Sequence, residues 1–370
     1  MRNRGLDILR AVAVLLVLGR HSDGPEVWKN VGWIGVDLFF VLSGFLISGL
    51  LFVEYKKTGG INWRRFFIRR GFKIYPAFYV MIFVTALWSI ARHHLVHWRA
   101  YLPEVLFYQS YQPDRVWLHT WSLAVEEHFY ILLPALLLIM LLFRKKEGDC
   151  PDPFRMVPLV CASLGAFCLL LRSYLAYTSP RFGEWWQDIL YPTHLRIDSL
   201  FFGVFLGYLY HFHSEKLERF KAGRWPSVLL LTGSLLLIST CLVFSLDSPF
   251  MLSFGLTALY VGFGGILLLV VWGGPATLSE SKRSRVQKFG NVFAYVGMYS
   301  YSIYLWHPMV SQHMRPFEML IWPGVTNAVV FWSYVLTSLT VGILLSRIIE
   351  YPTLHLRDRL FPSNSSSGKK

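Results

Sequence analysis

The sequence predicts an all-α protein, a polytopic transmembrane helix bundle of about ten spans. First, 54% of the 370 residues are hydrophobic and only 16% are charged, compared with about 25% in soluble domains, and the mean hydropathy is +0.43. Second, ten apolar stretches are long enough to cross a bilayer when tilt and polar interruptions are allowed. Third, lysine and arginine are concentrated in alternate connections between these stretches, as in membrane proteins with a fixed orientation.

The ten expected spans follow one another along nearly the whole chain. They cover residues 5–20, 33–54, 74–91, 119–143, 156–176, 190–212, 226–246, 250–272, 290–312 and 325–349. The first is the shortest, and Arg2 with Arg4 before it resembles the start of a signal peptide. Its only A-x-A sequence, at residues 11–13, stands at the beginning of the apolar run, so we expect no cleavage. We therefore expect one integral membrane domain over residues 1–352 and a disordered, serine-rich tail over 353–370.

The basic residues orient the expected bundle. The N-terminal segment, the loops at 55–73, 144–155, 213–225 and 273–289, and the segment after Glu350 hold 25 lysines and arginines, whereas the opposite loops hold six. The positive-inside rule therefore predicts that both termini, the tail included, are cytoplasmic. The net charge of +14 requires no nucleic acid, because these charges set topology and meet anionic lipid. We expect a multi-pass protein of a cell membrane, most simply the bacterial inner membrane.

Ionisable residues interrupt the first span on one face. At about 100° per residue, Arg10 and His21 lie nearly in register, ~16 Å apart along the helix, and Asp7 lies within roughly 40° of the same line. Charges inside a membrane are costly and usually face a bundle interior or an aqueous cavity. Asp7 and Arg10 could simply neutralise each other one turn apart, but His21 on the same stripe favours a functional site.

With this orientation, polar residues of five expected spans fall in the outer leaflet. They lie within a few turns of the outer surface and are His21, Asp37, Ser122, Glu126, Glu127, Arg196, Asp198 and His307. Some could be span ends that snorkel to the headgroups, and nearby tryptophans and tyrosines could form an interfacial belt. The short side chains of Glu126, Glu127 and Asp198 lie too deep to snorkel, so we expect a polar cavity open to the outer side.

A second polar cluster is expected on the inner face. Residues 63–76 interleave arginines and a lysine with aromatic residues directly before a span. Topology and lipid headgroup contact are sufficient to explain this composition. The alternative is a phosphate-rich ligand held by guanidinium forks, with Arg69, Arg70 and Lys73 as one clamp. A polyphosphate site inside and an acid–base site outside would together suggest group transfer across the membrane.

Five stretches resemble motifs of the acyltransferase-3 family and occur in that family's order. They are LDILRAVA at 6–13 with His21, GVDLFFVLSGFL at 35–46, the basic run that ends at 76, WSLAVEEHFY at 121–130, and SYSIYLWH at 300–307. Each is a weak, apolar pattern, but all five in order are specific and extend to Pro352. The resemblance implies an integral membrane O-acyltransferase. Members move an acyl group, often acetyl, from a cytoplasmic coenzyme A thioester to hydroxyls of surface sugars, peptidoglycan, lipids or small molecules.

The resemblance also implies roles for single residues. Arg10 and His21 match the family's Arg-x10-His pair, and Arg70 with Lys73 matches its Arg-x-x-Arg motif. Lys73 replaces the usual arginine and would lose a bidentate contact. His128 replaces a usual glutamine.

Acyl transfer requires an acceptor hydroxyl to lose its proton while it attacks a thioester carbonyl. A neutral histidine is the usual base, so His21 is the candidate, with Arg10 stabilising developing charge. Glu126 and Glu127 are further catalytic candidates that could orient the base or bind sugar hydroxyls. The candidates for acceptor binding are Asp37, Ser122, Arg196, Asp198 and His307. Two routes remain open: the pantetheine arm reaches up to His21, or His21 itself carries the acyl group.

The sequence predicts no metal and no permanently bound cofactor. It has no zinc-type ligand spacing, no GxGxxG and no P-loop, so an acyl-coenzyme A, acetyl-coenzyme A above all, is expected only as donor substrate. The expected partners are this donor, a glycan or small-molecule acceptor and the lipid bilayer, and no oligomeric state is predicted. The alternative function is a transporter or flippase, since such proteins also need ionisable residues in the membrane. Transporters often contain internal repeats, but no duplication relates the first five spans to the last five.

Overall fold

The structure is a computed structural model of the chain. It describes residues 3–22, 24–91, 96–112, 115–147, 152–178, 187–221, 224–272, 280–321 and 326–362. Within these ranges all regular structure is helical, so the predicted all-α class is confirmed.

The helices have the following bounds: α1 Arg4–Arg20, α2 Glu26–Val31, α3 Gly35–Thr58, α4 Trp63–Ala91, α5 Leu102–Val105, α6 Trp121–Glu147, α7 Val157–Thr178, α9 Gln187–Leu190, α10 Thr193–Phe212, α11 Ser214–Lys221, α12 Arg224–Ile238, α13 Thr240–Val243, α14 Leu256–Trp272, α15 Glu280–Met298, α16 Ser300–Ile321, α17 Asn327–Leu345 and α18 Tyr351–Leu360. A π-helical turn, η5 (Met251–Gly255), precedes α14, and a second one, η6 (Ser346–Glu350), joins α17 to α18. Single 3₁₀ turns are η1 Gly32–Ile34, η2 Trp98–Tyr101, η3 Gln109–Tyr111 and η4 Leu118–Thr120.

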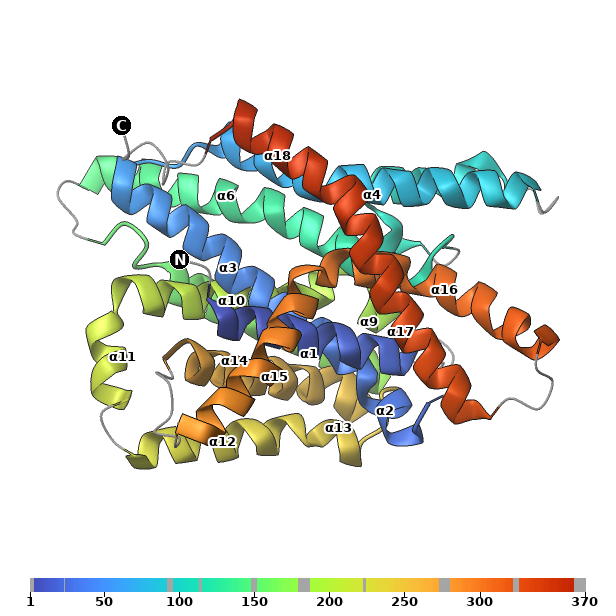
Figure 1. Cartoon of the computed structure of the whole chain (residues 1–370). Helices are drawn as coiled ribbons and strands as arrows, with labels where there is room; N and C mark the ends of the chain where they lie inside the picture. The colour runs from blue at the N-terminus through green and yellow to red at the C-terminus, as the bar shows by residue number, and fades with distance from the viewer. Residues whose placement is uncertain are drawn as a thin grey trace.

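Helix α1 lies inside the bundle and contacts α3, α14, α15 and α16. In Figure 1 the long helices run roughly side by side, α18 lies along α4 at the top of the view, and α12 packs on α14 at the bottom. Helix α1, which carries Arg10, is therefore surrounded by neighbouring helices, and an interior position is the least costly one for such a residue.

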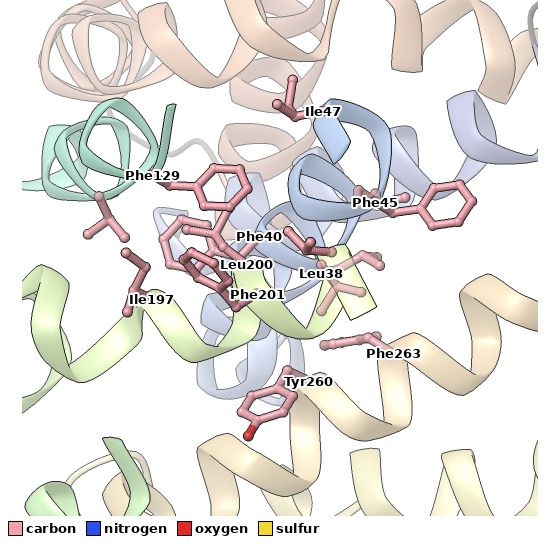
Figure 2. Close-up of a cluster of buried hydrophobic side chains, with 14 of the residues drawn as sticks. Leu38, Phe40, Phe45, Ile47, Phe129, Ile197, Leu200, Phe201, Tyr260 and Phe263 are labelled. Atoms are coloured by element: carbon pink, nitrogen blue, oxygen red, sulfur yellow. The ribbon is translucent and has the colours of Figure 1, made fainter. Parts of the chain in front are cut away.

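Helices α3 and α10 pack closely against each other. A Cβ atom at Gly44 would lie only 1.9 Å from the Leu200 carbonyl oxygen, and one at Gly203 would lie 2.3 Å from that of Val41. Small residues of this kind let two membrane helices approach to van der Waals contact. Around this contact a large apolar cluster forms between α3, α6, α10 and α14, in which Phe129 of α6 packs edge-on against Phe201 of α10 (Figure 2).

Seven helical segments of the described chain are long and apolar enough to cross a membrane. They are Glu26–Thr58, Trp63–Ala91, Leu118–Phe143, Val157–Thr178, Trp225–Val243, Met251–Trp272 and Asn327–Leu360. A polytopic helical membrane protein is therefore confirmed. The expected spans 5–20, 190–212 and 290–312 are not in this set, although helices occupy all three. The first forms a helix of only 17 residues, the second carries ion-paired residues, and the third is divided between α15 and α16.

The end of the chain differs from the prediction of a disordered tail. Residues 351–360 form α18, and only residues 363–370 lie outside the described part. Helix α18 continues α17 through η6 and packs on α4, where the Thr353 hydroxyl donates a 3.3 Å hydrogen bond to the Phe72 carbonyl oxygen. The serine-rich composition of the last residues does not extend to this segment, which contacts α4.

Candidate functional site

A polar pocket opens between α1, α3, α4, α6 and α16. Six residues predicted for the site line it: Arg10, Arg70, Lys73, Ser122, Glu126 and Glu127. The remaining polar lining residues are Ser43, Tyr130, Ser300, Tyr301 and Tyr304. All five motif stretches, the basic run included, thus contribute residues to one pocket, although they are far apart in the sequence.

The two carboxylates of the pocket have different surroundings. Glu126 accepts hydrogen bonds from the hydroxyls of Tyr130, at 2.7 Å, and Ser43, at 3.1 Å. Tyr130 stands four residues after Glu126, so one face of α6 supplies both groups. Glu127 accepts a 3.1 Å bond from the Tyr75 hydroxyl, and its second oxygen, Oε1, is buried without a partner among the described residues. A buried acceptor without a donor is costly, so this oxygen is suited to receive a ligand hydroxyl.

Arg10 extends into the pocket from α1. Its guanidinium Nη1 lies 3.6 Å from Asp7 Oδ1 one turn earlier, and the Arg10 side chain is 38% exposed whereas that of Asp7 is 6% exposed. The neutralising pair considered in the sequence analysis is therefore present. It does not exclude a functional role, because the guanidinium still faces the pocket.

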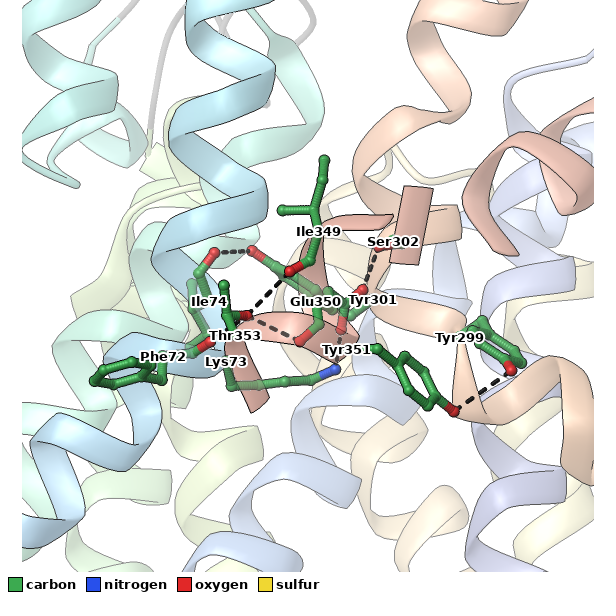
Figure 3. A network of polar contacts seen from close by, with 10 residues as sticks. All are labelled: Phe72, Lys73, Ile74, Tyr299, Tyr301, Ser302, Ile349, Glu350, Tyr351 and Thr353. Carbon is green, nitrogen blue, oxygen red and sulfur yellow. Dashed lines mark hydrogen bonds and ion pairs between the residues drawn. The ribbon is translucent and has the colours of Figure 1, made fainter. Parts of the chain in front are cut away.

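The three cations predicted as one clamp are engaged separately. Lys73 forms an ion pair with Glu350, which is only 1% exposed and also accepts a hydrogen bond from the Ser302 hydroxyl (Figure 3). Arg69 Nη2 lies 3.0 Å from Asp358 Oδ1 of α18. Arg70 has no ion-pair partner among the described residues and lies over the rings of Phe66 and Tyr130, at 5.8 and 5.6 Å. Arg70 is therefore the cation most available to a ligand in the pocket.

A second cavity, here called the basic vestibule, lies between α3, α4 and α18. Its charged lining residues are Glu54, Lys57, Arg65, Arg69, Arg70, Lys73 and Arg357. Arg70 and Lys73 line the polar pocket as well, so the two cavities share a wall of positive charge. The sequence predicts a cavity open to the outer side, and the structure adds this connection to the basic cluster.

His21 does not line the polar pocket but belongs to a cluster of three histidines. Its ring lies 4.9 Å from that of His307, whose ring lies 5.3 Å from that of His119. His21 Nδ1 is 3.0 Å from the Val17 carbonyl oxygen, so we assign the proton to Nδ1 and a free lone pair to Nε2. The residue as a whole is exposed at the end of α1. No group of three histidine, cysteine or carboxylate side chains in the described ranges has the geometry to hold a metal.

His307 is completely buried in this cluster. Its Nδ1 donates a 2.6 Å hydrogen bond to the Tyr304 carbonyl oxygen, and its Nε2 is buried without a partner in the described chain. The Tyr304 hydroxyl donates to the His119 carbonyl oxygen at 2.7 Å and lies 2.6 Å from the Ser122 hydroxyl. Tyr304 and Ser122 therefore separate the polar pocket from the histidine cluster. The sequence analysis missed His119, although it directly precedes the 121–130 motif.

Asp37, Arg196 and Asp198, predicted as acceptor-binding residues, lie outside the polar pocket. Arg196 Nη2 is 2.7 Å from Asp37 Oδ1, and Arg172 Nη2 is 2.8 Å from Asp198 Oδ2. All four side chains are at most 2% exposed. Arg172 also donates to the Thr257 hydroxyl at 2.9 Å. The sequence analysis did not single out Arg172, because a lone arginine in the fifth span has no nearby motif.

The connection that precedes α6, described over 96–112 and 115–120, braces the beginning of this helix. Glu104 is buried there and accepts hydrogen bonds from the Thr120 hydroxyl, at 2.7 Å, and from the Trp117 backbone N–H, at 3.4 Å. Burial raises the pKa of Glu104 to about 7. Gln109 Nε2 donates to the Thr120 carbonyl oxygen at 3.0 Å. These contacts hold the turn that carries His119 directly ahead of Ser122, and the sequence analysis missed Glu104.

The fold and the pocket define a class: a polytopic membrane protein with a charged pocket built from several helices. The sequence pattern of the acyltransferase 3 family, described as an acyltransferase domain, matches residues 3–347. The chain belongs to this family of acyltransferases.

The chain is similar to the peptidoglycan O-acetyltransferase OatA of Listeria monocytogenes. The two are 28% identical over 94% of the chain and 55% of that protein. A provisionally named O-acetyltransferase of Staphylococcus aureus is 30% identical over 82% of the chain and 50% of its own length. A provisionally named peptidoglycan O-acetyltransferase of Bacillus subtilis, YrhL, is 27% identical over 98% and 56%. The chain spans about half the length of these relatives. No solved structure matches it.

Proposed function

We propose that the chain is a membrane-bound O-acyltransferase that takes an acyl group, most simply acetyl, from a cytoplasmic acyl-coenzyme A. The acceptor is a hydroxyl of an extracytoplasmic glycan, and the relatives' names point to a cell-wall glycan. One observation carries the proposal: the basic vestibule and the carboxylate-containing polar pocket share Arg70 and Lys73. A donor with a phosphate-rich end and a reactive thioester end needs two such environments side by side.

On this proposal the vestibule binds the nucleotide end of the donor, and the pantetheine arm enters the polar pocket. Guanidinium groups bind phosphate oxygens through paired, charge-assisted hydrogen bonds. Arg10 then contacts the thioester end of the donor as the arm enters the pocket, while Glu127 accepts a hydrogen bond from a ligand hydroxyl. In this arrangement the acceptor hydroxyl loses its proton to His21 Nε2 and attacks the thioester carbon, and the coenzyme A thiolate leaves.

Because Tyr304 and Ser122 separate His21 from the pocket, the arm and the acceptor must meet beside this pair. Two routes stay open within the proposal: direct transfer after these side chains move aside, or an acyl-His21 intermediate.

Mass spectrometry of cell-wall glycans from cells with and without the chain tests the acceptor. Loss of an acetyl ester from those glycans without the chain is expected, and unchanged glycans would contradict the assignment.

The proposed topology has ten spans with both termini in the cytoplasm of a bacterial cell. We expect an epitope inserted at Gly60 and one fused to the C-terminus to be protected in intact spheroplasts, because basic residues gather on this side. An epitope inserted after Gln112 should be accessible. Labelling with an impermeant reagent before and after lysis measures all three. Protection of the epitope after Gln112 would overturn the topology and, with it, the outer location of His21.

The donor site predicts a specific effect of Arg70→Ala. The affinity of the purified protein for acetyl-coenzyme A should fall by about ten- to a hundredfold, because hydrogen bonds between charged groups are lost. Added salt should also weaken the binding of acetyl-coenzyme A by the wild-type protein, because it screens the charges. Arg64→Ala is the matched control, since Arg64 is an exposed arginine of the same helix end that lines neither cavity. Equal affinity of the Arg70→Ala variant and wild type in isothermal titration would place the donor elsewhere.

A further inference from the structure

Two guanidinium groups at the basic vestibule hold one exposed carboxylate. Asp358 Oδ1 lies 3.0 Å from Arg69 Nη2 of α4 and 2.9 Å from Arg357 Nε, and Asp358 Oδ2 accepts a 3.1 Å hydrogen bond from Arg357 Nη2. The Asp358 side chain is 53% exposed, so it can turn into solvent without uncovering apolar surface. Arg69 and Arg357 line the vestibule, whereas Asp358 does not.

This arrangement has the geometry of an anion site in a strongly basic surrounding. An arginine fork binds a carboxylate or a phosphate in the same bidentate manner. A phosphate monoester carries about −1.5 to −2 charge and three acceptor oxygens, so it can satisfy two guanidinium groups better than a single carboxylate does. Among the described residues that line the vestibule, Glu54 is the one acidic residue, and six are cations.

We propose that Arg69 and Arg357 form the binding site for the terminal phosphate monoester of the donor nucleotide, and that Asp358 is a resident anion which this phosphate displaces. The inference rests on the donor half of the proposed function. If the pantetheine arm leads into the polar pocket past Arg70, the nucleotide end stays in the vestibule. Coenzyme A carries its 3′-phosphate at that end. The C-terminal helix α18, which supplies Arg357, then becomes part of the donor site.

The proposal predicts a gain of affinity, which a merely structural role of Asp358 would not produce. In the full chain reconstituted in nanodiscs, Asp358→Asn should bind coenzyme A about two- to fivefold more tightly, the range expected when one exposed ion pair no longer competes. The matched control is Glu215→Gln in α11, which removes the same charge from an exposed acid outside the vestibule. It should leave the affinity unchanged.

A second probe, dephospho-coenzyme A, identifies which phosphate is bound. It lacks the 3′-phosphate but keeps the diphosphate, so Asp358→Asn should not improve its binding. Arg357→Ala should weaken coenzyme A by about ten- to a hundredfold and leave the dephospho form nearly unaffected.

Three results would overturn the inference while leaving the donor proposal intact. They are unchanged or weaker coenzyme A binding by Asp358→Asn, an equal gain for the dephospho form, and full affinity of Arg357→Ala. If wild type binds neither probe, the donor proposal fails and this inference fails with it.

Discussion

Replacing His21 with alanine should lower the rate of acyl transfer by about 10²–10⁴-fold, because that is the usual effect of removing a general base. Its Nδ1 is engaged with the Val17 carbonyl oxygen, so the neutral ring keeps its lone pair at Nε2. A residue at the surface can be truncated without leaving a cavity, so the variant should insert and fold. The measurement is transfer of labelled acetyl to glycan, normalised to protein in the membrane.

The pH dependence separates a base from a structural residue. A base acts only when neutral. Desolvation by the surrounding protein, together with the nearby Arg20 charge, lowers the pKa of His21 below the ordinary value for histidine, so the wild-type rate should rise as pH increases through this lowered pKa. The choice of control follows from the structure. His307 contacts His21 and is not a neutral comparison, whereas His313 of α16 contacts Trp88 and lies outside the histidine cluster. Activity in His21→Ala equal to that of His313→Ala would remove His21 from the chemistry.

The sequence identified several residues of the polar pocket, but not the partners that other helices bring to them. Arg10, Glu126 and Glu127 were recognisable because a charge in an apolar run is expensive and therefore informative. Lys73 was assigned to a ligand, but it pairs with Glu350, which lies 277 residues away. Such partners depend on how helices are arranged, and helical periodicity describes only one helix at a time.

For the fold as well, features of a single helix could be predicted, whereas features that depend on helix packing could not. Hydropathy identified the membrane class and the strongly apolar helices, since burial in lipid imposes a simple rule on composition. Hydropathy also predicted spans at 5–20 and 190–212, but neither α1 nor α10 is among the seven: α1 has only 17 residues, and α10 carries residues that form ion pairs with other helices. Helix α18 was missed for a related reason: its helical state depends on α4, with which Thr353 and Asp358 make contact.

Removing one partner of the buried ion pair between Arg172 and Asp198 should strongly destabilise the fold. Both side chains are at most 1% exposed, and Arg172 also donates to the Leu195 carbonyl oxygen at 2.5 Å. In Arg172→Met the carboxylate of Asp198 would stay buried without its partner, which typically costs about 3–5 kcal/mol. Since whole proteins are stable by only about 5–15 kcal/mol, we expect a marked loss of folded protein and a lower Tm in detergent.

The double variant Arg172→Met/Asp198→Leu distinguishes this structural role from acceptor binding. Replacing both members of a buried pair with apolar residues is often neutral, so the second change should restore much of the Tm that Arg172→Met loses. It should also restore acyl transfer, because neither side chain lines the polar pocket. If Asp198 binds the acceptor instead, the double variant will be stable but inactive. A single Arg172→Met variant with the Tm of wild type would show that the pair does not hold α7 and α10 together.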